Sequence, residues 1–209
     1  MKYLNRYKIF ENKNNTDSIC RLYGIDSYSI GTDGLINVDN NVVLPHHGLG
    51  EISLNFGVVT GLFNCGYNLI TSLEGCPSEV GGDFLCYCNE LTSLSGGPKK
   101  VGGNYSCSTN KLTDLKGAPD RVDNFYCSSN KLMSLEGAPS SFDGIYCEKN
   151  PIYSVVEVFI YNRSAVELFI DTDIIRGDEI IYDRLIWFFE EIRMVPDMDD
   201  IKKHYKIIR

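Results

Sequence analysis

The stretch VDNFYCSSNKL, residues 122–132, places apolar residues and one asparagine at the spacing LxxLxLxxNxL. The stretch FDGIYCEKNPI, residues 142–152, repeats this spacing. Across residues 65–147 a cysteine recurs at steps of 21, 21, 20 and 20 residues, and an asparagine follows each cysteine three positions later. A fixed period of this size predicts a solenoid, in which each unit buries its apolar face against its neighbours. The cysteines are Cys65, Cys86, Cys107, Cys127 and Cys147, and the asparagines are Asn68, Asn89, Asn110, Asn130 and Asn150.

The units differ in length by one residue. The earlier units carry one more residue between the first two apolar positions, as from Val80 to Phe84, and their step is therefore 21 residues rather than 20. A degenerate unit precedes them, with Leu44 at the cysteine position and His47 at the asparagine position. We therefore expect about six stacked units of 20–21 residues over residues 38–152.

Each position of the unit has a physical role. Side chains alternate along a strand, so Phe125 and Cys127 would point into the core and Tyr126 outward. The asparagine would satisfy backbone groups in the turn after the strand, and its stacked copies would form a ladder. Recurrent glycine and proline would hold the return segment in an extended, non-helical path. The predicted fold class is α+β: a repeat solenoid with one parallel sheet on its concave face and an irregular convex side.

The N-terminal end departs from the repeat. Residues 16–23 predict a short helix that ends at Gly24, and residues 28–30 and 35–38 predict two strands around a turn. A terminal repeat without a neighbour would leave core uncovered, so we expect residues 1–37 to form a small α/β cap.

The C-terminal end is expected to be helical. The apolar spacing predicts helices over residues 154–160 and 164–170, a long amphipathic helix over 178–194 and a further helix over 199–208. The chain would thus consist of an N-terminal cap (1–37), a solenoid (38–152) and a helical C-terminal cap (153–209). On the long helix, Trp187 and Phe189 would be exposed on a monomer.

Composition and charge narrow the classes of partner. The formal net charge is −8, and it divides into +1 for residues 1–37, −5 for residues 38–152 and −4 for residues 153–209. An acidic solenoid is a poor electrostatic match to a phosphate backbone, so nucleic acid is disfavoured as a partner. No run of 18 apolar residues occurs and residues 1–15 do not resemble a secretory signal. We therefore expect a cytoplasmic protein that does not bind a membrane.

Catalytic and metal-binding patterns are weak. Five of the eight cysteines occupy one repeat position, which favours buried structural thiols, and Cys88 is the cysteine expected to be most exposed. Cys86 and Cys88 form a CxC pair, but no second pair lies at the spacing of zinc ligands. No nucleophile and base stand at a motif spacing, and three histidines offer little for acid–base catalysis. We expect no enzyme, no cofactor and no metal.

Outward strand positions of a repeat protein line one shared face. On this face tyrosines would stand among small polar residues, as large and rigid anchors with one polar tip. The alternative is that they only cover the sheet face or pack on a cap. The candidate partner-binding residues are Tyr67, Asp83, Leu85, Tyr87, Asn104, Asn124, Tyr126 and Tyr146.

The repeat resembles the short bacterial type of leucine-rich repeat, which is known from secreted effectors with units of 20 to 22 residues. The layout is also similar to leucine-rich repeat proteins of tailed phages and marine bacteria, with a YGI segment (residues 23–25) before the repeats and an NPIY segment (residues 150–153) after them. The ubiquitin-ligase domain of the effectors is missing, because the residues after the repeats are too few and contain no cysteine.

Two functions are therefore expected. The first is a non-enzymatic module that binds a protein through the concave face, with a host factor as partner if the gene is viral. The second is a structural protein that forms homo-oligomers through the apolar C-terminal helices.

Overall fold

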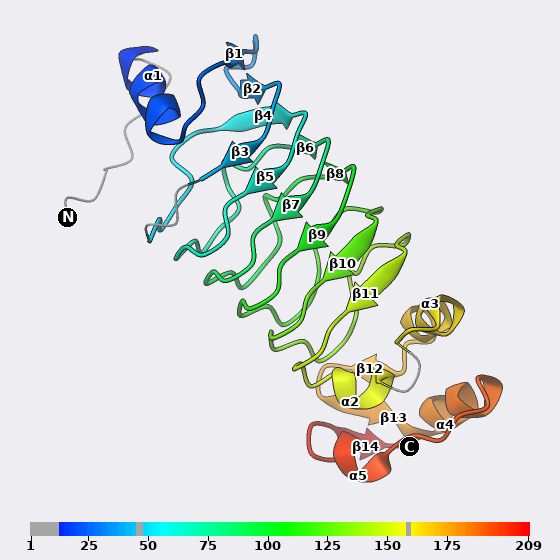
Figure 1. Cartoon of the computed structure of the whole chain (residues 1–209). Coiled ribbons are helices and arrows are strands. Elements are labelled where there is room, and N and C mark those ends of the chain that lie inside the picture. The colour runs from blue at the N-terminus through cyan, green and yellow to red at the C-terminus, as the bar shows by residue number, and fades with distance from the viewer. Residues whose placement is uncertain (1–12, 45–47, 158–159) are drawn as a thin grey trace.

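The chain folds as a parallel β-solenoid followed by a small mixed α/β segment (Figure 1). The structure, a computed structural model, describes residues 13–44, 48–157 and 160–209. His47, which was predicted to occupy the asparagine position of the first unit, lies outside the described residues. The repeat architecture predicted from the period is present.

The main sheet has six parallel strands, one from each successive repeat. Equivalent residues pair directly, as Phe63 with Phe84 and Phe84 with Tyr105. In the core the first two rings stack at a centroid distance of 5.9 Å, and the last two meet at 4.9 Å with a tilt of 43°. Consecutive strands define five turns. In chain order the strands are β3 (Val42–Val43), β5 (Phe63–Asn64), β7 (Phe84–Leu85), β9 (Tyr105–Ser106), β10 (Asn124–Tyr126) and β11 (Gly144–Tyr146).

The structure has a second sheet besides the single one predicted. The return segments, such as residues 69–78, contain no helix or strand, as predicted. Because the period is constant, extended segments ahead of the main strands also meet their own copies one turn later, as Glu79 meets Lys100. β1 closes this sheet by pairing antiparallel with β2. The sheet consists of β1 (Ser29–Ile30), β2 (Ile36–Val38), β4 (Phe56–Val59), β6 (Glu79–Val80) and β8 (Lys100–Val101).

The extra residue of the longer units lies in the corner between the two sheets. There a Cβ on Gly81 would collide with the carbonyl of Thr60, and one on Gly102 with the carbonyl of Gly81. Glycine therefore lets adjacent turns approach at this corner. In the shorter units the corner has no Gly-Gly pair, and the second sheet is reduced to a single bridge between Arg121 and Ser141.

The asparagine ladder consists of Asn68, Asn89, Asn110, Asn130 and Asn150, which are all buried. The Asn110 Nδ2 donates to the carbonyl of Cys107 in its own turn and to that of Cys86 in the preceding turn, both at 3.0 Å. Its Oδ1 accepts from the amide of Leu91, also at 3.0 Å. Asn89, Asn130 and Asn150 make the equivalent bonds. The predicted role of this residue is confirmed, and each side chain connects two turns.

The N-terminal segment agrees closely with its prediction. Helix α1 (Lys13–Leu22) is followed by Gly24 in the left-handed region at φ +69°, and β1 and β2 follow. The buried residues Ile19, Cys20 and Tyr23 belong to the same apolar cluster as the repeats.

The C-terminal segment is only partly helical, which corrects the expectation of a purely helical cap. Its short strands form a three-stranded sheet in the order β12-β13-β14. Gly177, at φ +63°, turns the chain between the first two strands, and the last strand comes from the tail predicted to be a helix. The elements are α2 (Tyr153–Val156), α3 (Arg163–Asp171), β12 (Ile175–Arg176), β13 (Glu179–Ile181), α4 (Tyr182–Glu191), α5 (Met198–Ile201) and β14 (Lys206–Ile208).

The long helix predicted over residues 178–194 is shorter in the structure. Its first residues form β13, which pairs with a strand on each side, so helix α4 begins only at Tyr182. Leu185 and Phe188 are buried as the amphipathic pattern predicts. Phe189 is also buried, at 2% exposure, because the segment folds around both helix faces, whereas Trp187 is 48% exposed. The expectation that both aromatic residues are exposed was therefore right only for Trp187.

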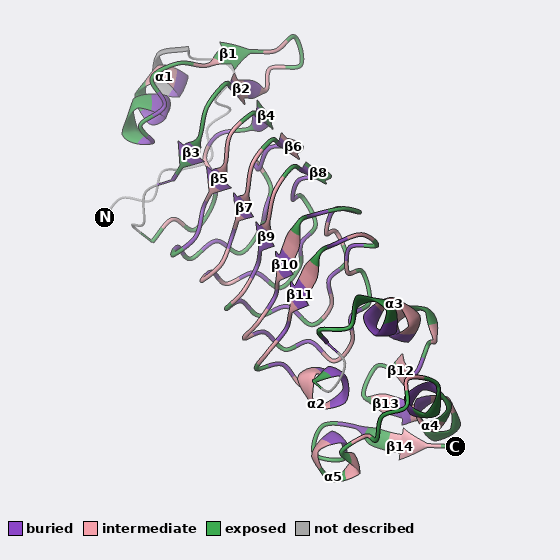
Figure 2. Ribbon diagram, turned by 45° about the vertical axis from the view of Figure 1, so that its right-hand side comes forward, coloured by how far each residue is buried: buried purple, intermediate pink, exposed green. Residues whose placement is uncertain are grey.

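One buried cluster runs through the solenoid into both end segments. Figure 2 shows buried residues in the interior of successive turns and on the inward sides of the terminal helices. The tail is anchored to the solenoid where the Tyr205 hydroxyl donates to the carbonyl of Met133 at 2.6 Å.

The asparagine ladder generates a stability prediction. Asn110→Ala would leave the Leu91 amide and the carbonyls of Cys86 and Cys107 without their side-chain partner. An unsatisfied buried group costs about 1–3 kcal/mol, so we expect the free energy of unfolding to fall by about 3 kcal/mol or more. Urea denaturation followed by circular dichroism measures it.

The control is Asn104→Ala, on the half-buried outer side of the same turn. Water can replace its hydrogen bonds, so a loss of about 1 kcal/mol or less is expected. Equal losses in the two variants would contradict the assigned role of the ladder.

Candidate functional site

The candidate site is the outward side of the main sheet, called here the six-stranded face. It is built by three columns of residues that run along the solenoid axis. Because the repeats stay in register, residues of one column come from equivalent positions of successive turns. The middle column is Val43, Asn64, Leu85, Ser106, Tyr126 and Tyr146; the corner column is Asn41, Leu62, Asp83, Asn104, Asn124 and Gly144; the turn column is Gly66, Tyr87, Ser108, Ser128 and Glu148.

The four predicted tyrosines form two pairs rather than one row. Tyr126 and Tyr146 stack at a centroid distance of 4.8 Å with an interplanar angle of 10°. Tyr67 and Tyr87 meet edge to face at 5.1 Å and 85°. The turn between them carries the small, buried Ser106 in place of an aromatic residue. Each ring is thus held by a second ring, which lowers the entropy that it would lose on binding a partner.

The polar candidates form a hydrogen-bonded chain along the corner column. The Asp83 Oδ1 accepts from the backbone amide of Asn104 at 2.8 Å and from its Nδ2 at 3.1 Å. The Asn104 Oδ1 accepts in the same way from the amide and Nδ2 of Asn124, at 3.2 and 2.9 Å. The structure therefore brings these three predicted residues together, and it gives each a structural role besides any role in binding.

The turn after each main strand places a residue other than glycine in the left-handed region. Tyr67 has φ +55° and Cys88 has φ +53°, and the residue just before the ladder asparagine does the same in every later turn. This conformation is unfavourable for residues with a Cβ. Tyr67 in this turn is 59% exposed. The Tyr87 ring packs over Gly66: a Cβ added to Gly66 would lie 3.1 Å from its ring carbons. Sequence spacing alone did not reveal this turn.

The repeat cysteines are buried and have free thiols. Burial raises the pKa of the Cys107 thiol, and it raises that of Cys147, beside Glu148, to about 12. At neutral pH these thiols are protonated and poor nucleophiles. Cys88, the cysteine expected to be most exposed, is the one described cysteine that is not buried.

Metal and membrane sites receive no support from the described residues. Across residues 13–44, 48–157 and 160–209, no three histidine, cysteine, aspartate or glutamate side chains gather in a way that could hold a metal ion. In the same ranges no helix has the length and apolar character needed to cross a bilayer.

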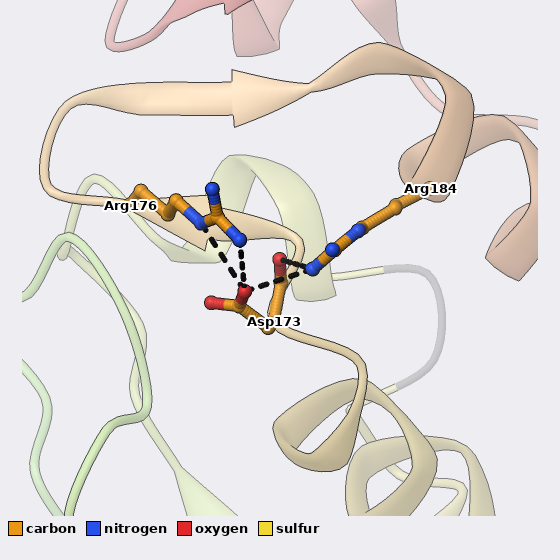
Figure 3. Close-up of polar contacts among 3 residues, drawn as sticks. All are labelled: Asp173, Arg176 and Arg184. Carbon is orange, nitrogen blue, oxygen red and sulfur yellow. Dashed lines mark hydrogen bonds and ion pairs between the residues drawn. The ribbon is translucent and has the colours of Figure 1, made fainter.

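A cluster of charged residues in the C-terminal segment was missed by the sequence reasoning. Figure 3 shows Arg176 and Arg184 converging on Asp173, whose Oδ2 accepts from Arg176 Nη2 at 2.7 Å and from Arg184 Nη1 at 2.8 Å. The hydrogen bond from Arg176 and then that from Arg184 lower the pKa of Asp173. Asp173 stands at φ +48° just ahead of β12. The cluster therefore connects the end of α3, strand β12 and helix α4.

Exposed apolar residues also occur on the C-terminal segment. Trp187 is half exposed on α4, and Val195, beyond the end of that helix, is 83% exposed. Acidic side chains surround them in sequence, with Glu190 and Glu191 on the last turn of α4. This surface is smaller than expected, because Phe189 is buried.

Comparisons of the chain with models of protein families, with curated proteins and with solved structures gave no match.

Thiol reactivity provides a direct check of this arrangement. In the native protein at neutral pH we expect Ellman's reagent to react rapidly with Cys88 alone, because the other thiols are buried. Full reaction should follow only on unfolding. Cys88→Ser should abolish the fast phase and leave the slow one. A fast phase that persists in this variant would contradict the burial of the cysteine positions.

Proposed function

We propose that the protein is a non-enzymatic binding module of the leucine-rich repeat type, which engages a protein partner through the six-stranded face. In this proposal the end segments cap the solenoid and the candidate residues act as a docking surface. The observation that carries the proposal is the presence of two tyrosine pairs on the six-stranded face.

The geometry of the pairs supports a role in binding. Tyrosines combine a large apolar area with a polar tip, and they are enriched among the residues that dominate binding energy at interfaces. Tyr67 is 59% exposed, so most of its ring is available for contact. The stacked ring of Tyr146 also lies close to Gly144, where a Cβ would meet its hydroxyl at 3.2 Å. A side chain in that corner position would disturb the pair.

The resemblance to phage proteins extends the proposal to the class of partner. If the gene is viral, the partner would be a protein of the host, met in the cytoplasm. The net charge of −8 makes nucleic acid a poor alternative.

A second candidate function is homo-oligomeric assembly through the C-terminal segment. It is favoured by the exposure of Trp187 and Val195, since such apolar side chains often mark contact surfaces. The burial of Phe189 weakens it, because less apolar surface is available for an interface.

Partner capture from a lysate tests the first candidate. We expect the double variants Tyr126→Ala/Tyr146→Ala and Tyr67→Ala/Tyr87→Ala each to lose the captured protein, since truncation of an anchor residue costs about 2 kcal/mol or more. Quantitative mass spectrometry of the captured material measures the loss.

The matched control is Tyr161→Ala, because Tyr161 is 77% exposed but lies outside the repeats. This variant should capture the same protein as the wild type. Capture that survives both double variants would refute binding through the six-stranded face, provided that circular dichroism shows them folded.

The second candidate makes a separate prediction about mass. Assembly through the C-terminal segment requires a species heavier than the 23.5 kDa chain in light scattering, and Trp187→Ser/Val195→Ser should restore a single chain. A wild-type mass of one chain at micromolar concentration would eliminate this function.

A further inference from the structure

The two halves of the six-stranded face differ in their apolar residues. Val43, Leu62 and Leu85 occupy outward positions on or beside β3, β5 and β7. Leu69 follows the turn after β5, and Val43 and Leu69 are 47% and 56% exposed. Beyond β7, the equivalent outward positions carry serine, threonine, asparagine, glycine, lysine, glutamate, proline and the Tyr126–Tyr146 stack. The outward apolar residues of the N-terminal half are Val43, Leu62, Tyr67, Leu69, Leu85 and Tyr87.

The net charge of the solenoid also differs between the two halves, with the boundary near residue 98. Residues 38–98 contain 6 acidic residues and no lysine or arginine, so their net charge is −6. Residues 99–152 contain 6 acidic and 7 basic residues, so their net charge is +1. Basic residues of the second part neutralise two of the carboxylates: Lys100 pairs with Glu79, and Lys111 pairs with Glu90.

Asp83 lies next to Leu62 in the corner column and two residues before Leu85. It precedes Phe84 in the strand, and Leu85 follows on the outward side. Within the described part of the chain its carboxylate accepts hydrogen bonds from the amide and side chain of Asn104 and forms no ion pair. Its charge is thus offset by dipoles alone and is available to a cation from outside.

We propose that the N-terminal half of the six-stranded face binds a protein segment that carries lysine or arginine next to aliphatic or aromatic side chains. This inference rests on the proposed function and specifies the partner's chemistry. The apolar side chains of the segment cover Leu69, Leu85 and the Tyr67–Tyr87 pair, and its cation approaches Asp83. Complementary charge speeds the encounter and selects the partner, while the apolar anchors provide most of the affinity.

A second copy of the chain fits this surface less well. Each copy carries a net charge of −8, so two copies repel each other. The basic residues of the solenoid lie beyond residue 98, where the outward positions carry no aliphatic side chain to occupy the first half.

The test begins with an unbiased selection. The full-length protein is immobilised and used to select binders from a random library of short linear peptides displayed on phage. We expect the selected peptides to be enriched in lysine or arginine adjacent to leucine, isoleucine, valine or phenylalanine. Selection of acidic or uncharged peptides, or of none above background, overturns the proposal.

Isosteric variants then locate the site. Asp83→Asn removes the charge but keeps an oxygen that can accept from Asn104, as Asn104 itself does for Asn124. For a selected peptide, fluorescence anisotropy should show about two- to five-fold weaker binding, which is the range of a solvent-accessible ion pair. Leu69→Ser should weaken binding about ten-fold or more, as expected for an anchor residue.

Asp123→Asn is the matched control, because it makes the same charge change at an exposed position in the second half of the solenoid. It should leave the affinity unchanged. An equal effect of Asp83→Asn and Asp123→Asn would show that only the overall charge matters, which overturns the assigned site.

The two proposals fail in distinguishable ways. If tyrosine variants lose a captured protein but selection yields no basic apolar peptide, the six-stranded face still binds a partner and only its stated chemistry is wrong. If capture survives the tyrosine variants, the proposed function itself fails, whatever the peptides show.

Discussion

The architecture depends on one repeated interaction, the side-chain amide of asparagine bonded to the backbone of two successive turns. The Asn110 Nδ2 reaches the carbonyls of Cys107 and Cys86, and its Oδ1 reaches the amide of Leu91. At this point the chain leaves the main sheet, and its buried backbone groups would otherwise lack partners. A single side chain satisfies three of them. This arrangement also fixes the register of each turn relative to the next, and the columns of the outward face depend on that register.

Close approach of the backbone at the corner is the second constraint. Gly81 and Gly102 permit the approach at their corners, and the second sheet extends through β8 but not into the shorter units. The shorter units lose most of that sheet but gain a third residue in the main strand, as β10 and β11 show. The two parts of the solenoid thus differ in backbone as well as in outward side chains. The stacked Tyr126–Tyr146 pair lies on the three-residue strands β10 and β11. Tyr67 and Tyr87 instead lie in the turns that follow the two-residue strands β5 and β7.

The repeat also explains why the groups that could bind a partner lie on the surface rather than in the core. The cysteine positions of the repeat are buried, so they contribute packing rather than reactivity. Outward positions do not have to fill the core, and they vary from turn to turn. That variation produces an apolar, acidic first half and a polar second half with more basic residues. A binding surface with two distinct halves favours partners that present matching groups in a defined order.

The sequence by itself determined the solenoid, the alternation of Phe125 and Cys127 against Tyr126, and the structural role of the asparagines. These features follow from contacts that recur at a constant separation, so a single period encodes them. It also placed the candidate tyrosines on one face. Only the tertiary structure decided that they form two pairs, because the left-handed turn at Tyr67 and the ring positions depend on neighbouring turns. The C-terminal segment was hardest to predict for the same reason: β14 pairs with β13 and Tyr205 contacts Met133 across long separations, so no local pattern records these contacts.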